Sequence, residues 1–172
     1  MALSNPAAFF DACRHGVMGP TLDQDEVSGA NTVLDAFDGQ PLAYTAYALA
    51  TAWHETAHTM RPVKEFGGTR YLTRMYDPKS PLANRRKMAI RNGNTTPGDG
   101  PKYCGRGFVQ LTWKNNYARA GAKLGVDLVN HPERALEEDI AAKIMREGMV
   151  GGWFSGKSLG SCSPNPRSCA GN

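Results

Sequence analysis

The 172-residue sequence has no uninterrupted apolar run near the roughly 18 to 20 residues that a membrane-spanning helix needs. Its first residues, MALSNPAAFFDACRHG, lack the basic segment and long apolar run of a secretory signal. We therefore expect a protein made in the cytoplasm and not inserted into a membrane. No internal repeat and no RNA- or DNA-binding motif is found, so nucleic acid is not an expected partner.

Cysteine is scarce, with four residues at positions 13, 104, 162 and 169. They form no C-x-x-C pair, and their spacings fit no zinc finger. In a reducing compartment we expect free thiols. The alternative for the last two is a Cys162–Cys169 disulfide formed after export.

Composition indicates one globular domain, because 41% hydrophobic residues are enough to bury a core. We place this domain at residues 1–159. From residue 160 the sequence GSCSPNPRSCAGN has no periodicity, and we expect a disordered tail over 160–172. The net charge of +4 favours an anionic partner such as a bacterial cell envelope, although an ordinary basic surface explains it equally well.

Helical spacing recurs through the first third of the chain. Asn5-Pro6 is a helix start, and Thr21 with Gln24 forms a capping box before a second helix. A third helix is predicted from about Leu42 to Met60. Its expected core stripe is Leu42, Ala46, Leu49 and Trp53, which leaves Glu55 above the small residues Ala48, Thr51 and Ala52, with room for a ligand.

The middle of the chain is richer in turns. We expect a loop and a short hairpin over 61–76, then a long polar connection over 77–102 with one short helix near 82–90. The basic residues of that connection could meet an anionic polymer or simply be solvated: Lys79, Arg85, Arg86, Lys87 and Arg91. Further helices are predicted over 115–124 and, with interruptions, from about 130 to 149.

Two carboxylates, Glu55 and Glu65, lie ten residues apart across the end of the third helix. A continuous helix would separate them by about 15 Å. Arg61-Pro62 is an expected stop, because proline disfavours helical geometry in the residue before it. The chain can then fold back, and two carboxyl groups facing each other across a cleft are what glycoside hydrolysis requires.

The same stretch offers a zinc alternative, because His54-Glu55-Thr56-Ala57-His58 matches H-E-x-x-H. On a helix both histidines would share one face. The extended motif of one such peptidase class needs glycine at 61 and histidine at 64, where this chain has Arg61 and Lys64. The other interpretation makes His54 a polar partner in the cleft and His58 a helix-end residue.

The residues AWHETAHTMRPVKEFGG and YCGRGFVQLTWKNNY together resemble the family 19 glycoside hydrolases, which include plant and bacterial chitinases and many phage endolysins. The similarity covers roughly Phe9 to Leu159. The family pattern Y-x-G-R-G-x-x-Q-L-[ST]-x-x-x-N-Y is matched at nine positions between Tyr103 and Tyr117. The short spacing from Glu55 to Glu65 is similar to that of the compact endolysin branch.

This resemblance implies a mainly α, lysozyme-like fold with two lobes, a small β-hairpin and a central cleft. It implies inversion of configuration, with Glu55 as the general acid, Glu65 as the base and Thr112 holding the attacking water. It places further residues at the substrate: His54, Tyr103, Arg106, Gln110, Asn116 and Tyr117, with Arg106 bracing the cleft. It implies no metal and no cofactor.

We therefore expect a monomeric hydrolase of β-1,4-linked glycans that contain N-acetylglucosamine. Peptidoglycan is the favoured substrate, as for an endolysin or lysozyme acting on the bacterial cell wall, and chitin is the alternative. Two other classes stay open: an H-E-x-x-H zinc peptidase and a non-catalytic wall-binding module.

Overall fold

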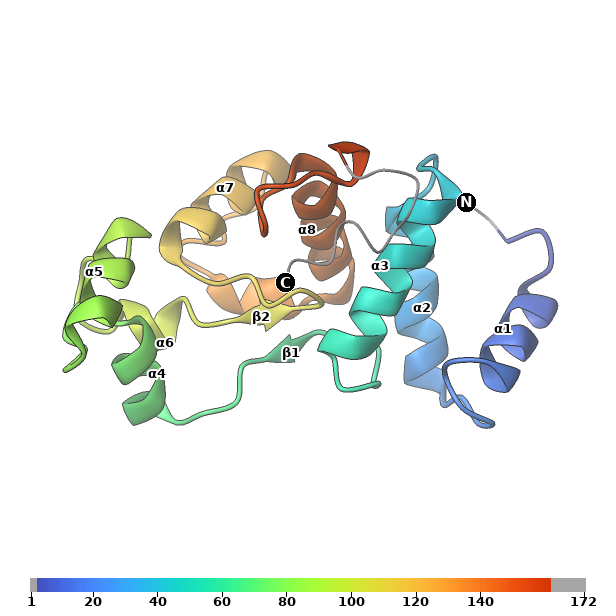
Figure 1. Cartoon of the computed structure of the whole chain (residues 1–172), viewed down its shortest axis with the longest axis horizontal. Helices are drawn as coiled ribbons and strands as arrows, with labels where there is room; N and C mark the ends of the chain where they lie inside the picture. Colours follow the sequence, from blue (N-terminus) through green and yellow to red (C-terminus); the bar gives the residue numbers. More distant parts are fainter. Residues whose placement is uncertain (1–2, 162–172) are drawn as a thin grey trace. The chain divides into compact units, whose positions relative to one another are not determined.

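The computed structural model describes residues 3–161, and over that range the fold is mainly helical with one two-stranded sheet (Figure 1). This agrees with the expected fold class. The elements in chain order are α1 (Pro6–His15), α2 (Gln24–Ala36), α3 (Leu42–Glu55), β1 (Val63–Lys64), α4 (Thr69–Tyr76), α5 (Ala83–Arg91), α6 (Asp99–Lys102), β2 (Arg106–Gly107), α7 (Lys114–Leu124), the 3-10 helix η1 (Pro132–Leu136), α8 (Glu138–Gly151) and the 3-10 helix η2 (Leu159–Ser161).

The chain divides into two compact units. Among the described residues, the first holds 3–61 and 145–161, and the second runs from Pro62 to Ile144. Glu55 thus belongs to the first unit, whereas Glu65 and the whole 103–117 motif belong to the second. Over residues 3–161 no helix combines the length and the apolar character that crossing a bilayer requires.

The core of the first unit forms where α2 packs on α3 (Figure 1). Ala48 and Ala52 of α3 are completely buried, whereas Leu42 is 72% exposed. The predicted stripe of α3 is therefore wrong, and the face expected to hold a ligand is the packed one. Alanines occupy the packed face because small side chains let two helices approach closely. Whether a larger residue of α3 is buried depends on which part of the fold lies opposite it.

The start of α2 also differs from the prediction. Asp23, not Thr21, is the cap: its Oδ1 accepts hydrogen bonds from the Asp25 and Glu26 amides, and Glu26 Oε2 accepts one from the Asp23 amide. This is a reciprocal capping box shifted by two residues. The Asn5 cap of α1 is confirmed, because its side chain accepts from the Ala8 amide.

In the second unit, β1 pairs antiparallel with β2, with Val63 opposite Gly107 and Lys64 opposite Arg106. The pairing joins segments far apart in sequence, so the expected local hairpin over 61–76 is wrong. α4 occupies the second half of that range instead. Gly67 permits the tight entry to the helix, because a Cβ there would lie 2.3 Å from the Tyr71 ring.

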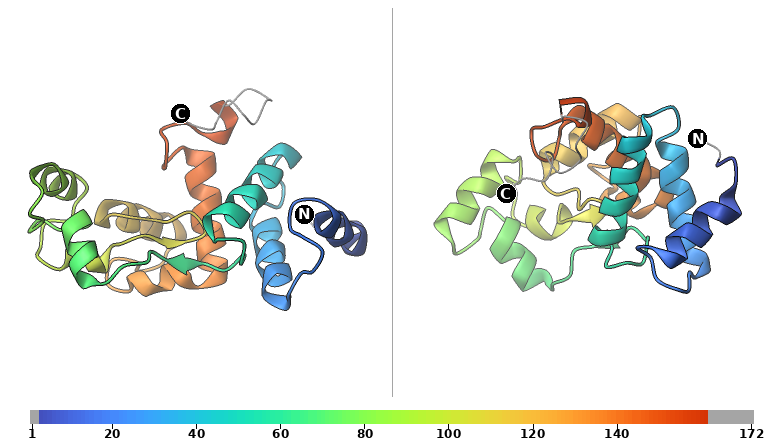
Figure 2. Two further views of the ribbon diagram at one scale, coloured as in Figure 1. Left: turned by 60° about the horizontal axis from the view of Figure 1, so that its bottom comes forward. Right: turned by 45° about the vertical axis from the view of Figure 1, so that its right-hand side comes forward.

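Buried polar side chains hold the long connection between α4 and α7. Asp77 Oδ2 accepts from the amides of Gly98 and Gly100. Asn94 donates to the Tyr76 carbonyl at 2.9 Å, and its Oδ1 accepts from the Lys114 amide. These bonds fix α4, which packs on α5 and α6 (Figure 2). The predicted short helix is confirmed as α5.

The last part of the fold follows the prediction in outline. α7 matches the helix expected over 115–124, and the one expected from 130 to 149 is divided into η1 and α8. η2 includes residues 160 and 161, which were expected to be disordered. The rest of the predicted tail, with the Cys162–Cys169 alternative, lies outside the described residues. Cys13 and Cys104 have free thiols, as expected.

Candidate active site

Glu55 is the last residue of α3, and its side chain is exposed. The prediction of a helix to Met60 is wrong, because Thr56 caps α3 at this point. The buried Thr56 hydroxyl donates to the Ala52 carbonyl at 2.7 Å and accepts from the Met60 amide at 3.0 Å. α3 therefore ends at Glu55, and the Glu55 carboxyl group lies at an exposed turn.

The chain after Glu55 adopts left-handed backbone angles, with φ of 52° at Ala57, 71° at His58 and 51° at Met60. The His58 ring stacks on Trp53 with 4.8 Å between the ring centroids. His58 thus lies beyond α3, and the shared helix face that the zinc interpretation needs is absent. Within residues 3–161, no three His, Cys, Asp or Glu side chains gather as a metal site would require. His54 is exposed.

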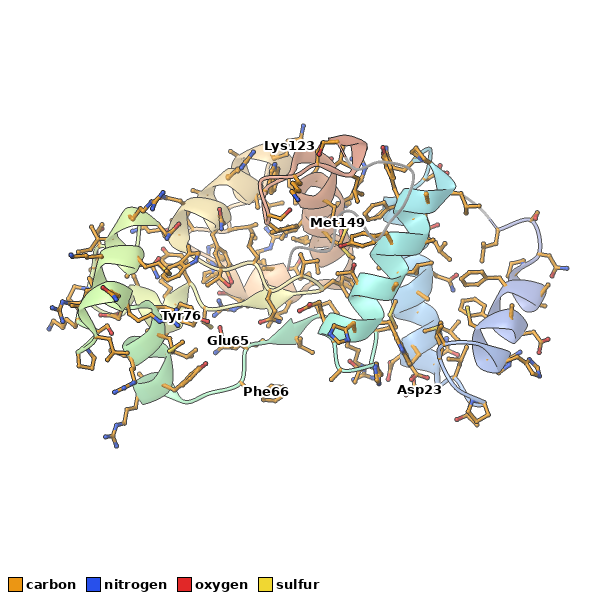
Figure 3. The ribbon with its side chains drawn as sticks, viewed as in Figure 1. Asp23, Glu65, Phe66, Tyr76, Lys123 and Met149 are labelled. Carbon is orange, nitrogen blue, oxygen red and sulfur yellow. The ribbon has the colours of Figure 1, made fainter. Side chains whose placement is uncertain are left out.

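Glu65 directly follows β1 and is held at three points (Figure 3). Its amide donates to the Gly105 carbonyl at 2.8 Å, which extends the pairing of β1 with β2. Its Oε1 accepts from the Tyr76 hydroxyl at 2.7 Å, and its Oε2 accepts from the Gly105 amide at 3.2 Å. Each carboxylate oxygen therefore has a donor, and the half-buried side chain has a defined direction.

Tyr76, the last residue of α4, is a site residue that the sequence did not reveal. Burial, together with the hydrogen bond to Glu65 and the charge of Glu65, raises the pKa of the Tyr76 phenol above its ordinary value. The hydroxyl thus stays a donor. The ring meets Trp113 edge-on at 5.0 Å. The available signal was the helical spacing of Leu72 and Tyr76 after two glycines.

Gly105 brings Glu65 and Gln110 together. A Cβ at this glycine would lie 2.3 Å from Gln110 Oε1 and 3.2 Å from Glu65 Oε2. Gln110 also donates to the Val63 carbonyl at 3.2 Å, so its side chain spans from the motif to β1. The structure therefore places the predicted residues Glu65 and Gln110 side by side, next to a glycine where an added Cβ would displace the Gln110 amide.

Thr112 and Asn116 continue this arrangement toward α7. The Thr112 hydroxyl donates to the Gln110 carbonyl at 2.9 Å, and the Asn116 side chain donates to the Thr112 carbonyl at 2.8 Å. Both side chains are half-buried. The Thr112 oxygen still has lone pairs that can accept a hydrogen bond from a water.

Tyr103 and Tyr117 cannot be the substrate contacts that the sequence predicted. Their exposed fractions are 1% and 0%, and their ring centroids lie 5.5 Å apart. The Tyr103 hydroxyl donates to the Val129 carbonyl, and that of Tyr117 to the Cys104 carbonyl. Burial raises the pKa of the Tyr117 phenol. Both rings are core residues behind the 104–107 turn.

Arg106 braces this core. It is buried, and its Nη1 donates to the carbonyls of Lys102 and Cys104 and to the Tyr117 hydroxyl. The sequence placed Arg106 at the substrate as a brace of the cleft. The bracing is what these contacts show, because all three partners of Nη1 are groups inside the second unit.

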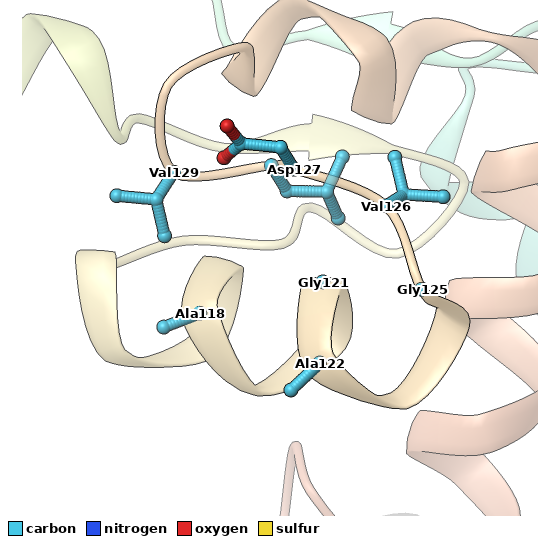
Figure 4. A pocket seen from close by; sticks show the side chains of 8 residues that line it. Ala118, Gly121, Ala122, Gly125, Val126, Asp127 and Val129 are labelled. Atoms are coloured by element: carbon cyan, nitrogen blue, oxygen red, sulfur yellow. The ribbon is translucent and has the colours of Figure 1, made fainter.

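A separate hollow of about 310 Å³ lies between α7 and the segment 125–129 (Figure 4). Small and aliphatic residues line it, and Asp127 is its only titratable side chain. The hydrogen bond from the Asn130 backbone, and to a smaller extent the one from its side chain, lower the pKa of Asp127. With one carboxylate already engaged, this hollow lacks the paired carboxyl groups of a hydrolase.

Comparison with known proteins identifies the chain's relatives. The chitinase class I family matches residues 46–154, which include Glu55, Glu65 and the 103–117 motif. An endochitinase of Arabidopsis thaliana is 32% identical over 107 residues, or 62% of this chain and 35% of its own length. Chitinase 11 of Oryza sativa is 48% identical over 52 residues, or 30% of this chain and 20% of its own. An inactive chitinase-like protein of Hevea brasiliensis is 53% identical over 34 residues, or 20% and 11%.

The matches thus span only a minor part of each curated relative. Among solved structures, chitinase C of Streptomyces griseus aligns with a TM-score of 0.51 at 23% identity, covering 77% of this chain and 51% of that one. This likeness confirms the predicted lysozyme-like fold. The family match covers well over half of the sequence and both halves of the predicted site. The chain belongs to the chitinase class I family, which is glycoside hydrolase family 19.

Proposed function

We propose that this chain hydrolyses β-1,4-linked glycans containing N-acetylglucosamine, with inversion at the anomeric carbon. The observation that carries the proposal is the support of Glu65, whose two carboxylate oxygens accept from the Tyr76 hydroxyl and the Gly105 amide. A base must be oriented before the water arrives, and a donor on each oxygen fixes the direction of this carboxylate.

In the proposed reaction Glu55 gives its proton to the glycosidic oxygen, and the bond from that oxygen to the anomeric carbon breaks. Glu65 takes a proton from a water whose oxygen attacks the same carbon from the opposite face. The Thr112 oxygen accepts the other hydrogen of this water. Such a reaction needs the two carboxyl groups about 6.5–9.5 Å apart in the working enzyme. A β-linkage then yields an α-anomer as the first product.

Two substrates fit this chemistry, since both chitin and peptidoglycan contain β-1,4-linked N-acetylglucosamine. The names of the curated relatives support chitin. The positive net charge supports peptidoglycan, because a basic protein is attracted to an anionic wall. We propose peptidoglycan as the main substrate and chitin as the second.

The test is hydrolysis of peptidoglycan and of chitin oligomers side by side, with the anomer of the first product identified by NMR. We expect an α-anomer and a loss of about 10²–10⁴-fold in the Glu55→Gln variant, the usual contribution of a general acid. A β-anomer would contradict inversion. Normal turnover by Glu55→Gln would remove Glu55 from the mechanism.

The same assay separates the two rival functions. A zinc peptidase would cleave the peptide part of the wall and lose its activity in EDTA. A wall-binding module would adsorb to the polymer and release no sugar from it. Either result would overturn the proposed hydrolysis. The first would also require a metal site other than the H-E-x-x-H pair, because His58 lies beyond α3 and shares no helix face with His54.

A further inference from the structure

The mild net charge of the chain conceals a strong local excess. Between Phe66 and Gly98 there are seven basic residues and one acidic residue, Asp77. Subtracting these from the 20 basic and 16 acidic residues of the whole chain leaves 13 and 15. The rest of the protein is therefore slightly acidic, and its basic character comes entirely from this one segment.

The structure gathers these charges on α4, α5 and the connection between them, where α4 packs against α5 (Figure 1). Five of the seven side chains are exposed: Arg70, Arg74, Lys79, Lys87 and Arg91. We call this the α4–α5 basic surface. Asp77 forms no ion pair with these side chains: it is 1% exposed, and its carboxylate accepts from the backbone amides of Lys79, Gly98 and Gly100.

The cations of this surface have no anionic partner among residues 3–161. The ion pairs of the described chain involve other basic residues, such as Lys114 with Asp99 and Arg134 with Glu137. Arg86 donates to the Ser80 carbonyl and forms no pair with a carboxylate. Unpaired cations on one surface repel one another, and this repulsion destabilises the folded chain. Binding of an external anion would reduce the repulsion.

The basic surface is continuous with the Glu65 site. α4 carries Arg70 and Arg74 outward, and its last residue, Tyr76, holds Glu65. From α5, Arg85 lies near enough to the Tyr76 phenol for its charge to act on that group. The surface thus begins beside the proposed base and extends along α5.

We propose that the α4–α5 basic surface binds the peptide carboxylates of peptidoglycan while the glycan occupies the Glu65 site. This rests on the proposed function and names the part of its substrate that chitin lacks. Guanidinium groups match carboxylates with two parallel hydrogen bonds. Met88 and Ile90, which are 44% and 55% exposed, add apolar contacts of the kind that short peptide side chains offer.

The experiment measures binding of the Glu55→Gln protein to purified peptidoglycan sacculi by sedimentation, because this variant leaves the polymer intact. In this background Arg74→Gln, Lys79→Gln and Lys87→Gln are combined, since all three are exposed and lie outside the proposed catalytic set. The matched control combines Arg119→Gln, Lys123→Gln and Lys157→Gln, which remove the same charges elsewhere.

We expect the surface variant to bind sacculi about tenfold more weakly at low salt, as for three exposed ion pairs of ordinary strength. The control variant should bind like wild type. The difference in binding between wild type and the surface variant should vanish near 0.5 M salt, because the Debye screening length is then on the order of a few ångströms. Sacculi whose carboxylates have been converted to amides should bind wild type and surface variant equally. Chitin powder should do the same.

Three results would overturn the proposal. The first is equal weakening in the control variant, which would indicate net charge alone. The second is an unchanged difference on amidated sacculi. The third is an equal or larger effect on anionic phospholipid vesicles, which would identify a membrane surface. Failure of hydrolysis is a separate outcome: if wild type cuts neither polymer but binding to sacculi depends on the basic surface, docking stands and the proposed catalysis falls.

Discussion

The Tyr76 hydroxyl donates a hydrogen bond of 2.7 Å to Glu65 Oε1, and it links the end of α4 to the residue after β1. The link depends on both ends being fixed. Asn94 donates to the Tyr76 carbonyl, and the Glu65 amide donates to the Gly105 carbonyl. Glu65 is therefore oriented by the fold of its own unit, although it follows β1 in a glycine-rich loop.

Tyr76→Phe removes this donor and keeps the ring against Trp113. A hydrogen bond to a charged group contributes about 1.5–3 kcal/mol, so we expect kcat to fall roughly 10- to 100-fold. KM should change little, because the proposed role of Glu65 is to act on the water and not to bind the sugar. Steady-state kinetics on a soluble chitin oligomer, with the melting temperature as a check on folding, make the measurement. A change confined to KM would assign Tyr76 to substrate binding instead.

Gly105→Ala tests the close approach of Glu65 and Gln110. The added Cβ would lie 2.3 Å from Gln110 Oε1, so this side chain must move and leave its bond to the Val63 carbonyl. We expect at least a tenfold loss of kcat/KM with the fold retained, because a misplaced group near the chemistry can cost about 100-fold.

Gly68→Ala is the matched control for this substitution, because a Cβ at Gly68 meets nothing within 4 Å and its φ is −76°. It should retain normal activity. If Gly105→Ala is as active as Gly68→Ala, the contact between the Gly105 position and the two side chains has no catalytic importance.

The sequence predicted the helices whose ends carry strong local signals. Asn5 with Pro6 fixes the start of α1, and the turn after the 115–124 helix is marked by Gly125, which adopts a φ of 67°. The motif from Tyr103 to Tyr117 identified the family. These successes rest on backbone preferences that neighbouring residues determine without help from the rest of the fold.

The errors concern what lies opposite a residue. Nothing local shows that Ala48 and Ala52 would be completely buried while Leu42 stays 72% exposed. Tyr103 and Tyr117 belong to the family motif, yet both side chains are buried in the core and cannot contact a sugar. Tyr76 was missed because its contact with Glu65 depends on the pairing of β1 with β2, which no local pattern predicts.

Stability at alkaline pH should depend on Tyr76. Its pKa is raised in the folded protein, so the unfolded phenol loses its proton first, near pH 10, while the folded one keeps it. The unfolded state then binds fewer protons, and stability falls as pH rises above about 10. Each such phenol adds at most about 1.4 kcal/mol of lost stability per pH unit.

Urea unfolding of wild type and Tyr76→Phe at pH 8 and pH 11 makes this measurement. Because the phenylalanine variant cannot titrate there, its stability should decline less steeply than that of wild type. Tyr117, whose pKa burial also raises, contributes in the same direction in both proteins and cancels in the comparison. Parallel declines would show that the Tyr76 phenol ionises equally in the two states.

Thr112 provides the sharpest test of the attacking water. Its hydroxyl hydrogen is committed to the Gln110 carbonyl at 2.9 Å, so toward a water the Thr112 oxygen can act only as an acceptor. Thr112→Val removes that acceptor at nearly constant volume, whereas Thr112→Ser keeps it. We expect kcat to fall about tenfold or more in the valine variant with KM nearly unchanged, and the serine variant to stay within a few-fold of wild type, as for loss of one interaction realised in the transition state. Kinetics of the three proteins on the same soluble oligomer decide it. Equal activity of the valine and serine variants would mean that the water is held elsewhere, and Gln110, which lies beside Glu65, would be the next residue to substitute.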